Sequence, residues 1–458
     1  MPIATINPTT GKTVRTFHPY GATEVERRLA LSVEVAGFLR ETSLAQRADW
    51  MRAAADAMEV DTEQAARMVT LEMGKPIEQA RAEVAKCVRA MRFEADHAPE
   101  ILADEPLDDP SSVHASQAWT TWQPLGTVLA VMPWNFPLWQ VMRFAAPALL
   151  AGNAGLLKHA SNVPQAALYL DSLFSQGGFP TGAFQALLIA SSTVADIIAD
   201  ERVKAVTITG SEPAGRSVAA TAGKNIKRTV LELGGSDPFI VMPSVDLDKA
   251  TDTAVHARVQ NNGQSCIAAK RFIIHRDVFD EFVDRFTTKM GGLAVGDPAD
   301  EATDVGPLAT ESGREDLAEL VDDATSKGAS VLVGGSRLEG PGWFYAPTAL
   351  AGLTDDMHIV SEEAFGPVAA LYPVADRNEA VNVANQTTFG LSSAVWSDDA
   401  DEQAWFVRKL DAGAVFINGM SESSAELPFG GVKNSGYGRE MGNAGMREFC
   451  NLKAVWKA

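Results

Sequence analysis

The sequence predicts an α/β protein with two domains, each built around a mainly parallel sheet. The first 100 of its 458 residues carry apolar residues at helical spacing. From Gly126 onward, short β-branched runs alternate with helical stretches, and a second alternating series begins near Ser236. Strands that alternate with helices form sheets covered by helices on both faces, so each series predicts one domain.

The expected elements follow the two series in order. The helices of the first 100 residues are expected at 22–41, 44–59 and 76–96. The first series has expected strands at 126–132, 154–160, 184–190, 203–210 and 228–235, with helices at 163–176 and 212–225. The second series has expected strands at 237–242 and 271–275, with helices at 246–262 and 277–290.

Two further segments differ from the body of the chain. Residues 103–123 combine prolines with alternating polar and apolar residues, which predicts an extended hairpin that projects from the body. Residues 446–458 also alternate and are expected to add a strand to this hairpin, in the same or in another subunit.

Composition limits the classes of partner. Lys and Arg total 39 against 59 Asp and Glu, so the net charge is −20, which argues against nucleic acid or an anionic membrane. The three cysteines are too few for a disulfide framework or a zinc site, and this favours a reducing cytoplasm and no metal. The N-terminal residues show no targeting signal, and no apolar run reaches the roughly 18 residues of a membrane helix.

Cys266 stands out because it ends the polar stretch QNNGQSC. A cysteine kept for packing behaves as a small hydrophobe and should lie among apolar neighbours, as Cys87 and Cys450 are expected to do. The polar, glycine-bearing surroundings of Cys266 instead indicate an accessible thiol that is available for chemistry.

Glu232 is a second candidate, since it ends an apolar strand two residues before a Gly-Gly pair. Its carboxylate is either a capping or salt-bridged structural group, or an acid/base whose pKa is raised by its apolar setting. A single helix is expected between Glu232 and Cys266, so both can face one cleft between the domains.

Two loops carry further candidates. Asn135, between Trp134 and Phe136 and flanked by prolines, is either a turn residue or an amide that can donate to an oxyanion. In TGSEPAG, Gly210, Ser211 and Gly215 are placed at the end of a strand and the start of a helix. That position suits a phosphate, although a plain strand-to-helix turn has the same pattern. Arg143 interrupts an apolar helix, where it is either a salt-bridged group or a ligand for an anion.

Together these stretches resemble the aldehyde dehydrogenase superfamily over nearly the whole chain. The matching motifs are PWNFP, LLKHAS, TGSEPAG, LELGGSDP, NNGQSC, SEEAFGPV and LPFGGVKNSGYGRE, in the family's order. Among family members, NNGQSCIAAKRF with LLKHASNVP is most similar to bacterial enzymes that oxidise succinate semialdehyde with NADP. The resemblance implies a Rossmann-like cofactor domain (1–102 and 124–234), an α/β catalytic domain (235–428) and an oligomerisation hairpin (103–123 and 446–458).

The resemblance also implies a chemistry for the candidates. Cys266 is expected to add to the aldehyde carbon and form a thiohemiacetal. The Asn135 side chain and the backbone N–H of Cys266 are expected to stabilise the oxyanion. Loss of hydride then leaves a thioester, which water hydrolyses with Glu232 as general base.

Cofactor contacts carry over in the same way. Gly210 and Ser211 are expected at the pyrophosphate, Lys158 at the adenosine ribose and Glu363 at the nicotinamide ribose, although Lys158 can be a solvated lysine and Glu363 a salt-bridged group. Ser161 stands where NAD-preferring relatives often carry glutamate, so we expect a preference for NADP, with NAD possible. The remaining expected cofactor contacts are Trp134, Thr209, Gly215, Leu233 and Phe365.

Three departures from the family pattern bear on the site. His159 stands where many relatives have proline after the ribose lysine, and the contact of Lys158 with the ribose is expected to survive this change. Gln260 replaces a common phenylalanine, which puts the pocket shape in doubt. Ser265 and Ile267 flank Cys266, so no neighbouring thiol can form a protective disulfide with it.

The expected substrate is succinate semialdehyde or a similar short aldehyde acid, with Arg143 at its carboxylate. Ser423 and Ser424 are either hydroxyl donors to the same carboxylate or solvated residues of a polar loop. The alternative within the class is another short aliphatic or ω-carboxylated aldehyde. A cofactor-free thiol esterase and a non-catalytic binding protein are the alternatives outside it. The complete nucleotide motif set argues against the first, and the pair Cys266 and Glu232 argues against the second. A homodimer or homotetramer is expected.

Overall fold

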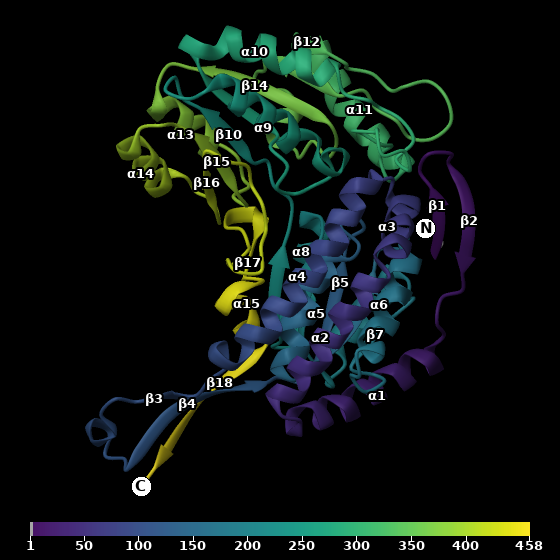
Figure 1. Ribbon diagram of the computed structural model, residues 1–458, viewed down its shortest axis with the longest axis vertical. Coiled ribbons are helices and arrows are strands. Elements are labelled where there is room, and N and C mark those ends of the chain that lie inside the picture. Colours follow the sequence, from purple (N-terminus) through teal and green to yellow (C-terminus); the bar gives the residue numbers. More distant parts are fainter. Residues whose placement is uncertain (1–2) are drawn as a thin grey trace.

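A six-stranded sheet forms the centre of the lower body in Figure 1, in a computed structural model that describes residues 3–458. The strand order is β17-β9-β8-β5-β6-β7, and all pairs are parallel except β17 with β9. The strands are β5 (Thr127–Met132), β6 (Ala154–His159), β7 (Phe184–Ala186), β8 (Val203–Thr209), β9 (Arg228–Glu232) and β17 (Gly436–Tyr437).

Helices cover both faces of this sheet, as alternating strands and helices predict. Val128 and Ala130 of β5 point into a core shared with several helices, whereas Leu129 points into the core on the opposite face. The helices of the first core are α2 (Leu44–Val60), α3 (Thr62–Met73), α4 (Ile77–Ile101), α5 (Trp139–Ala151) and α6 (Pro164–Gln176). Those of the second are α7 (Val194–Ala199) and α8 (Glu212–Lys224), while α1 (Ala22–Glu41) contributes Leu39 to the first core and Leu29 to the second.

A seven-stranded sheet forms the upper body, with the order β12-β13-β14-β11-β10-β15-β16 (Figure 1). It is parallel except for β12, which runs antiparallel to β13. Its strands are β10 (Pro238–Val241), β11 (Arg271–His275), β12 (Ser330–Val333), β13 (Thr348–Ala351), β14 (Val368–Val374), β15 (Ser393–Trp396) and β16 (Val415–Ile417). Its helices are α9 (Leu247–Val259), α10 (Arg276–Gly291), α11 (Glu311–Ser326), α12 (His358–Ser361), α13 (Arg377–Asn385) and α14 (Ala400–Lys409).

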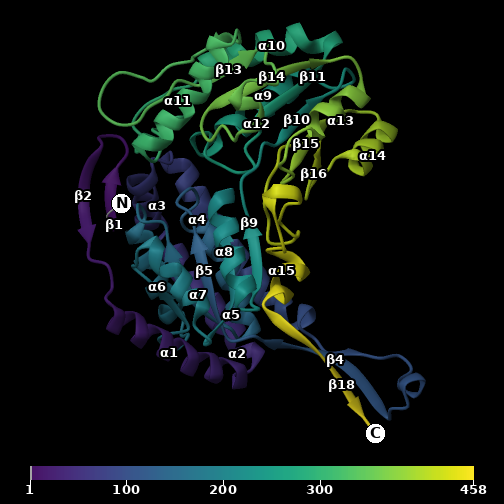
Figure 2. The same cartoon turned by 180° about the vertical axis from the view of Figure 1, so that it is seen from behind.

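A three-stranded antiparallel sheet projects from the body and carries the C-terminus (Figure 2). It consists of β3 (Glu105–Pro106), β4 (Gln117–Pro124) and β18 (Cys450–Lys457). The long partner of β4 is β18 of the same chain, and β3 adds only a short edge. The projecting hairpin and its added C-terminal strand are therefore present, while its role in oligomerisation stays a prediction.

Several details differ from the expected elements. Residues 3–17 form a β-hairpin, β1 (Ile3–Asn7) and β2 (Lys12–Phe17), whereas the pattern predicts only helices for the first 100 residues. Helix α3 was missed, and the strand expected at 184–190 ends at Ala186. The last strand of the six-stranded sheet comes from far along the chain, because β17 pairs with β9. There Gly436 lies so close that a Cβ would be 1.9 Å from the carbonyl oxygen of Leu231.

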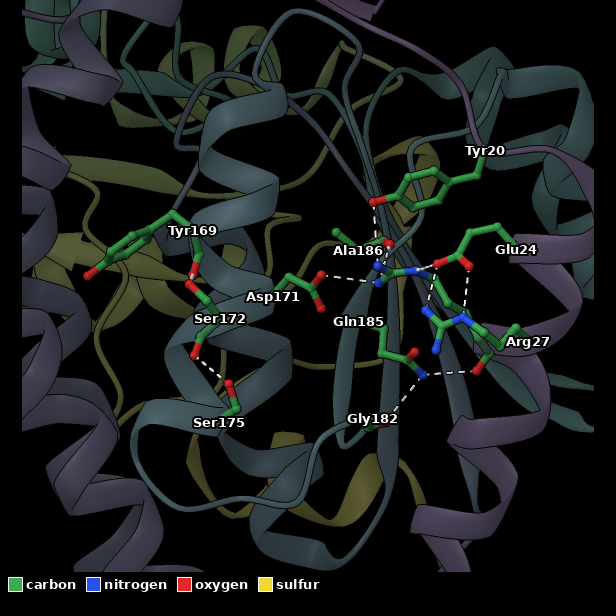
Figure 3. A network of polar contacts seen from close by, with 11 residues as sticks. Tyr20, Glu24, Arg27, Tyr169, Asp171, Ser172, Ser175, Gly182, Gln185 and Ala186 are labelled. Atoms are coloured by element: carbon green, nitrogen blue, oxygen red, sulfur yellow. Dashed lines mark hydrogen bonds and ion pairs between the residues drawn. The ribbon is translucent and has the colours of Figure 1, made fainter.

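A polar network fastens α1 to the sheet edge at β7 (Figure 3). Arg28 forms ion pairs with Glu24 at 2.8 Å and with Asp171 of α6 at 3.1 Å. It also donates to the carbonyl oxygen of Ala186, and Gln185 Nε2 donates back to the Arg28 carbonyl at 2.9 Å. This network ties α1, α6 and β7 together at the β7 edge of the sheet. None of the helices in residues 3–458 combines the length and apolar character that crossing a membrane requires.

Candidate active site

Cys266 lies where two cavities meet, between the two large sheets. A cavity of about 450 Å³ contains Cys266 together with residues of α4 and α5. A second cavity of about 290 Å³ contains Cys266 together with the carboxyl ends of β8 and β9. Gln140 also borders both cavities. A thiol at this junction can contact one molecule bound in each of the two cavities.

The backbone before Cys266 turns sharply at two asparagines. Helix α9 ends at Val259, and Asn261 (φ 55°) and Asn262 (φ 58°) adopt the left-handed conformation that asparagine tolerates best after glycine. Asn262 Nδ2 donates to the carbonyl oxygens of Gly74 and Pro307, which anchors the turn. The helix therefore stops, and the chain presents Cys266 to the cavities.

Asn135 is joined to the same turn. Its Nδ2 donates to the carbonyl oxygen of Gln264 at 3.1 Å, and Asn261 Nδ2 donates to the carbonyl oxygen of Asn135 at 2.7 Å. The amide nitrogen has two N–H groups, and one of them is left for another acceptor. Asn135 lines the smaller cavity next to Cys266, so the structure brings these two predicted residues together.

His159 supports the loop that carries Asn135. Its Nε2 lies 2.9 Å from the Pro137 carbonyl oxygen, and the N–H of Ala160 donates to Nδ1 at 3.0 Å. This pattern assigns a neutral imidazole with its proton on Nε2. Burial lowers the pKa of His159 to about 4, which agrees with the neutral form. Strand β6 stays in register with β5 up to His159, so the missing proline does not disturb the backbone.

The surroundings of Cys266 favour its protonated thiol over the thiolate. Burial raises the pKa of Cys266 to about 12, although the positive charges of Arg143 and Lys270 oppose this shift. Lys270 also positions the loop, because its ammonium donates to the carbonyl oxygens of Ser265 at 2.8 Å and Cys266 at 2.6 Å.

Glu232 is not in contact with either cavity. It ends β9 with a buried carboxylate, and neither oxygen finds a hydrogen-bond partner among the described residues. Burial, and then the neighbouring carboxylate of Glu440, raise the pKa of Glu232 well above its ordinary value. Glu440 is in turn paired with Arg143, at 2.7 Å.

The smaller cavity collects most of the residues predicted to hold a dinucleotide. Lys158, Ser161 and Gly215 do not line it. Lys158 is buried at the carboxyl edge of the sheet, and its ammonium has no hydrogen bond or ion pair within residues 3–458. The predicted residues that do line the cavity are Trp134, Thr209, Gly210, Ser211, Leu233, Glu363 and Phe365.

Glu363 reaches this cavity with a fixed partner. Its carboxylate pairs with Lys270 at 3.0 Å. It also packs so closely against the backbone that a Cβ on Gly234 would lie 2.4 Å from Glu363 Oε2. Glu363 is therefore both a salt-bridged residue and a cavity residue, as the two interpretations of the sequence allowed.

The larger cavity holds Arg143 and Ser423 but not Ser424. The Arg143 guanidinium lies over the ring of Phe429 at 4.4 Å. Ser423 Oγ accepts hydrogen bonds from Trp139 Nε1 at 2.9 Å and from Lys86 Nζ at 3.3 Å. Gln260 also lines this cavity, where many relatives have phenylalanine, and makes the wall more polar.

The model of the aldehyde dehydrogenase family matches residues 1–455 of this chain. The chain belongs to the aldehyde dehydrogenase family. The resemblance and the fold predicted from the motifs are therefore confirmed.

Individual family members agree over the full length. A Mycobacterium avium protein described as succinate-semialdehyde dehydrogenase [NADP(+)] is 60% identical over 457 residues, covering 100% of this chain and 97% of that protein. A Mycobacterium tuberculosis (strain H37Rv) protein described as succinate-semialdehyde dehydrogenase [NADP(+)] 1 is 59% identical over 458 residues and is covered completely. The crystal structure of succinic semialdehyde dehydrogenase from Streptococcus pyogenes with NADP+ superposes with a TM-score of 0.96, at 36% identity and 99% coverage of both chains.

Three polar residues of this aldehyde dehydrogenase site were missed from the sequence. Lys270 lies four positions after Cys266 in CIAAKRF, and its place after the nucleophile was the available signal. Glu440 ends the motif LPFGGVKNSGYGRE, whose local pattern predicts no separate role for this carboxylate. Lys86 belongs to an ordinary amphipathic helix, and no local pattern sets it apart.

Proposed function

We propose that this aldehyde dehydrogenase oxidises succinate semialdehyde to succinate with reduction of NADP. The observation that carries the proposal is the position of Cys266 between two different cavities. One cavity is lined by the predicted dinucleotide residues, and the other contains the cations Arg143 and Lys86. The names of relatives that are 59% and 60% identical over the full chain support the same substrate and cofactor.

The first step is carried by the groups around Cys266. Once the thiol has lost its proton to solvent, Sγ forms a bond to the aldehyde carbon as the carbonyl π bond breaks, which gives a thiohemiacetal with a negative oxygen. The free N–H of Asn135 Nδ2 and the backbone N–H of Cys266 stabilise this oxyanion. In support, the Cys266 N–H has no acceptor among the described residues, and Asn135 is held in place by Gln264.

NADP, when bound in the smaller cavity, supplies the acceptor for the hydride. The chain's own residues fit it: the Lys158 ammonium is unpaired within residues 3–458, and Glu363 is held against Gly234 by Lys270. Ser161 lies three residues after Lys158 in the chain and offers a hydroxyl to a 2′-phosphate, which a glutamate would repel.

The last step is hydrolysis of the Cys266 thioester, with Glu232 as general base. For this role the carboxylate has to turn from Glu440 toward Cys266, because it lines neither cavity. It also has to lose its proton, because burial and Glu440 raise its pKa. We infer that Glu232 is protonated in the free enzyme and acts as a base only when the acyl group is bound to Cys266.

A panel of aldehydes, each assayed with NADP and with NAD, tests the proposal. We expect the highest kcat/KM for succinate semialdehyde with NADP. A simple aliphatic aldehyde that is oxidised equally well would favour the alternative substrate class, and thiol-dependent ester hydrolysis without any cofactor-dependent turnover would favour a hydrolase.

We also propose a homodimer or homotetramer in the cytoplasm, with the sheet of β3, β4 and β18 as the contact between subunits. Large apolar side chains are exposed on this sheet and its loop, namely Leu107, Val113, Leu452 and Trp456. Light scattering of the full chain, and of a variant that ends after residue 449, tests this assembly.

A further inference from the structure

One face of α4 forms a wall of the larger cavity. The lining residues Gln79, Ala82, Glu83, Lys86 and Arg89 recur at three- and four-residue spacing, so they share this face. Lys86 and Arg89 bring two positive charges to a protein whose net charge is −20. This cationic face is therefore a local feature that runs against the overall charge.

The acidic residue on the same face does not cancel this charge. Glu83 forms an ion pair with Lys75, and both side chains are only 1% exposed. Its Oε1 also accepts from the backbone N–H groups of Leu138 and Trp139, at 2.9 and 3.0 Å, where it caps the start of α5. Glu83 therefore has a structural role, and it does not neutralise the positive charge of Lys86.

Lys86 itself is held but not neutralised. Its ammonium lies 4.7 Å from the centre of the Trp139 ring and donates to Ser423 Oγ at 3.3 Å. The nearest carboxylate, that of Glu422, is 3.8 Å away on a side chain that is 66% exposed. A pair with such an exposed partner contributes little, because water screens it. Lys86 is thus positioned by an indole and a hydroxyl, with its charge available to the cavity.

Arg143 of α5 is a further cation of the cavity, and a buried carboxylate already neutralises part of its charge. Its Nε pairs with buried Glu440, so part of its attraction for an anion is already used. Burial lowers the pKa of Lys86, Glu422 opposes this shift, and the charge of Arg143 lowers the pKa further. The two cations are therefore close enough to repel each other, and an anion bound between them relieves that repulsion.

We propose that Lys86 is a specificity-determining residue that binds the remote carboxylate of the aldehyde acid together with Arg143. The inference rests on the proposed function, because it names how that substrate class is selected. Cys266 and the two cations border one cavity, so the aldehyde carbon and the carboxylate of one short molecule can be held at the same time. Trp139 and Ser423 act as positioning residues for the ammonium.

The experiment compares succinate semialdehyde with butanal, an uncharged aldehyde of the same carbon number, in the full-length protein. The readout is the ratio of the two kcat/KM values. In Lys86→Met this ratio should fall by about 10- to 100-fold, the equivalent of one charge-assisted hydrogen bond, mainly through KM for the acid. Lys86→Arg should restore most of the ratio. The matched control Arg92→Met removes another cation of α4 that pairs with Asp56 and Glu59 outside the cavity, and should keep the wild-type ratio.

The outcomes separate the two proposals. A wild-type enzyme without preference for the acid would overturn the proposed substrate, and the role of Lys86 with it. Suppose instead that the wild type prefers the acid, that Lys86→Met keeps this preference and that Arg143→Met loses it. This result would overturn the role of Lys86 and leave the proposed function intact. If Lys86→Met does not fold, Lys86→Gln, which can still donate to Ser423, replaces it and must show the same loss.

Discussion

Arg143 Nε lies 2.7 Å from Glu440 Oε2, and both side chains are 2% exposed. This buried ion pair lies between the larger cavity and Glu232. The Glu440 carboxylate adds to the effect of burial and raises the pKa of the neighbouring Glu232, whereas the Arg143 guanidinium lowers it. One pair thus links the cavity of the proposed substrate with the residue proposed to activate water.

Glu440→Gln should destabilise the protein by about 3–5 kcal/mol, because it leaves the Arg143 guanidinium buried without a charged partner. Urea unfolding followed by circular dichroism measures this change. The control is Asp96→Asn, which removes an exposed partner of Arg52 and should cost less than about 1 kcal/mol. Equal effects of the two variants would contradict the assignment.

Cys266→Ala should abolish aldehyde oxidation while NADP binding persists, because the nucleophile is removed and the cofactor cavity is kept. Glu232→Gln should slow turnover by roughly 10²–10⁴, as for a lost general base. A rapid burst of NADPH should survive in Glu232→Gln, since the thioester still forms. Stopped-flow absorbance at the NADPH band checks both variants, and turnover by Cys266→Ala would refute the mechanism.

Ser161→Glu should shift the cofactor preference from NADP to NAD by at least about tenfold in the ratio of kcat/KM values. The new carboxylate repels a 2′-phosphate and accepts a hydrogen bond from a 2′-hydroxyl. Ser161→Ala is the control and should lower kcat/KM with NADP by roughly tenfold, as one lost hydrogen bond to a charged phosphate implies, while kcat/KM with NAD stays unchanged. Wild-type enzyme that prefers NAD would contradict the prediction.

The Cys266 thiol should react faster as pH rises, because burial raises its pKa to about 12 and only the thiolate is nucleophilic. The rate of iodoacetamide alkylation of the free enzyme should increase about tenfold per pH unit between roughly pH 6.5 and 8.5. Mass spectrometry should place the label on Cys266, since Cys87 and Cys450 are buried. A rate that levels off near neutral pH would show a much lower pKa.

His159 should make stability depend on pH in a defined direction. Its pKa is lowered to about 4 in the fold, against about 6.5 when unfolded, so its contribution is complete above pH 6.5 and is lost as pH falls toward 4. The full loss corresponds to about 3 kcal/mol.

His159→Phe removes this dependence and leaves the Pro137 carbonyl oxygen without its donor, which should cost about 1–3 kcal/mol near neutral pH. The difference in unfolding free energy between wild type and variant should therefore shrink between pH 6.5 and pH 4. A difference that stays constant over this range would mean that the imidazole titrates normally in the fold.

The sequence was informative wherever chemistry depends on local pattern. Alternating strands and helices predicted both large sheets, and the polar turn before Cys266 identified the nucleophile candidate. The strand at β17 was not predictable in this way, because Gly436 and Tyr437 carry no periodic signal and pair with a strand some 200 residues earlier. The hairpin of β1 and β2 was missed because its turn and short strands precede a long helical region that dominated the pattern.

Part of the candidate site could be predicted from individual residues, but the contacts between its side chains could not. Asn135 and Cys266 meet as expected, because both lie on loops at the carboxyl ends of strands or helices. The pairing of Arg143 with Glu440 joins residues that are far apart in the chain, so no spacing rule reveals it. The same holds for Lys86 and Ser423, which meet only because α4 and a C-terminal loop border one cavity.

The pairing of β17 with β9 also determines when the six-stranded sheet can be completed during synthesis of the chain. Strand β9 is an open edge until residue 436 has been made, so the ribosome must produce nearly the whole chain of 458 residues before the first large sheet is complete. At about 5–20 residues per second, that edge stays unpaired for roughly ten seconds or more after its own synthesis. Unpaired edges recruit other strands, so nascent chains of this protein should depend on chaperone protection more than finished ones.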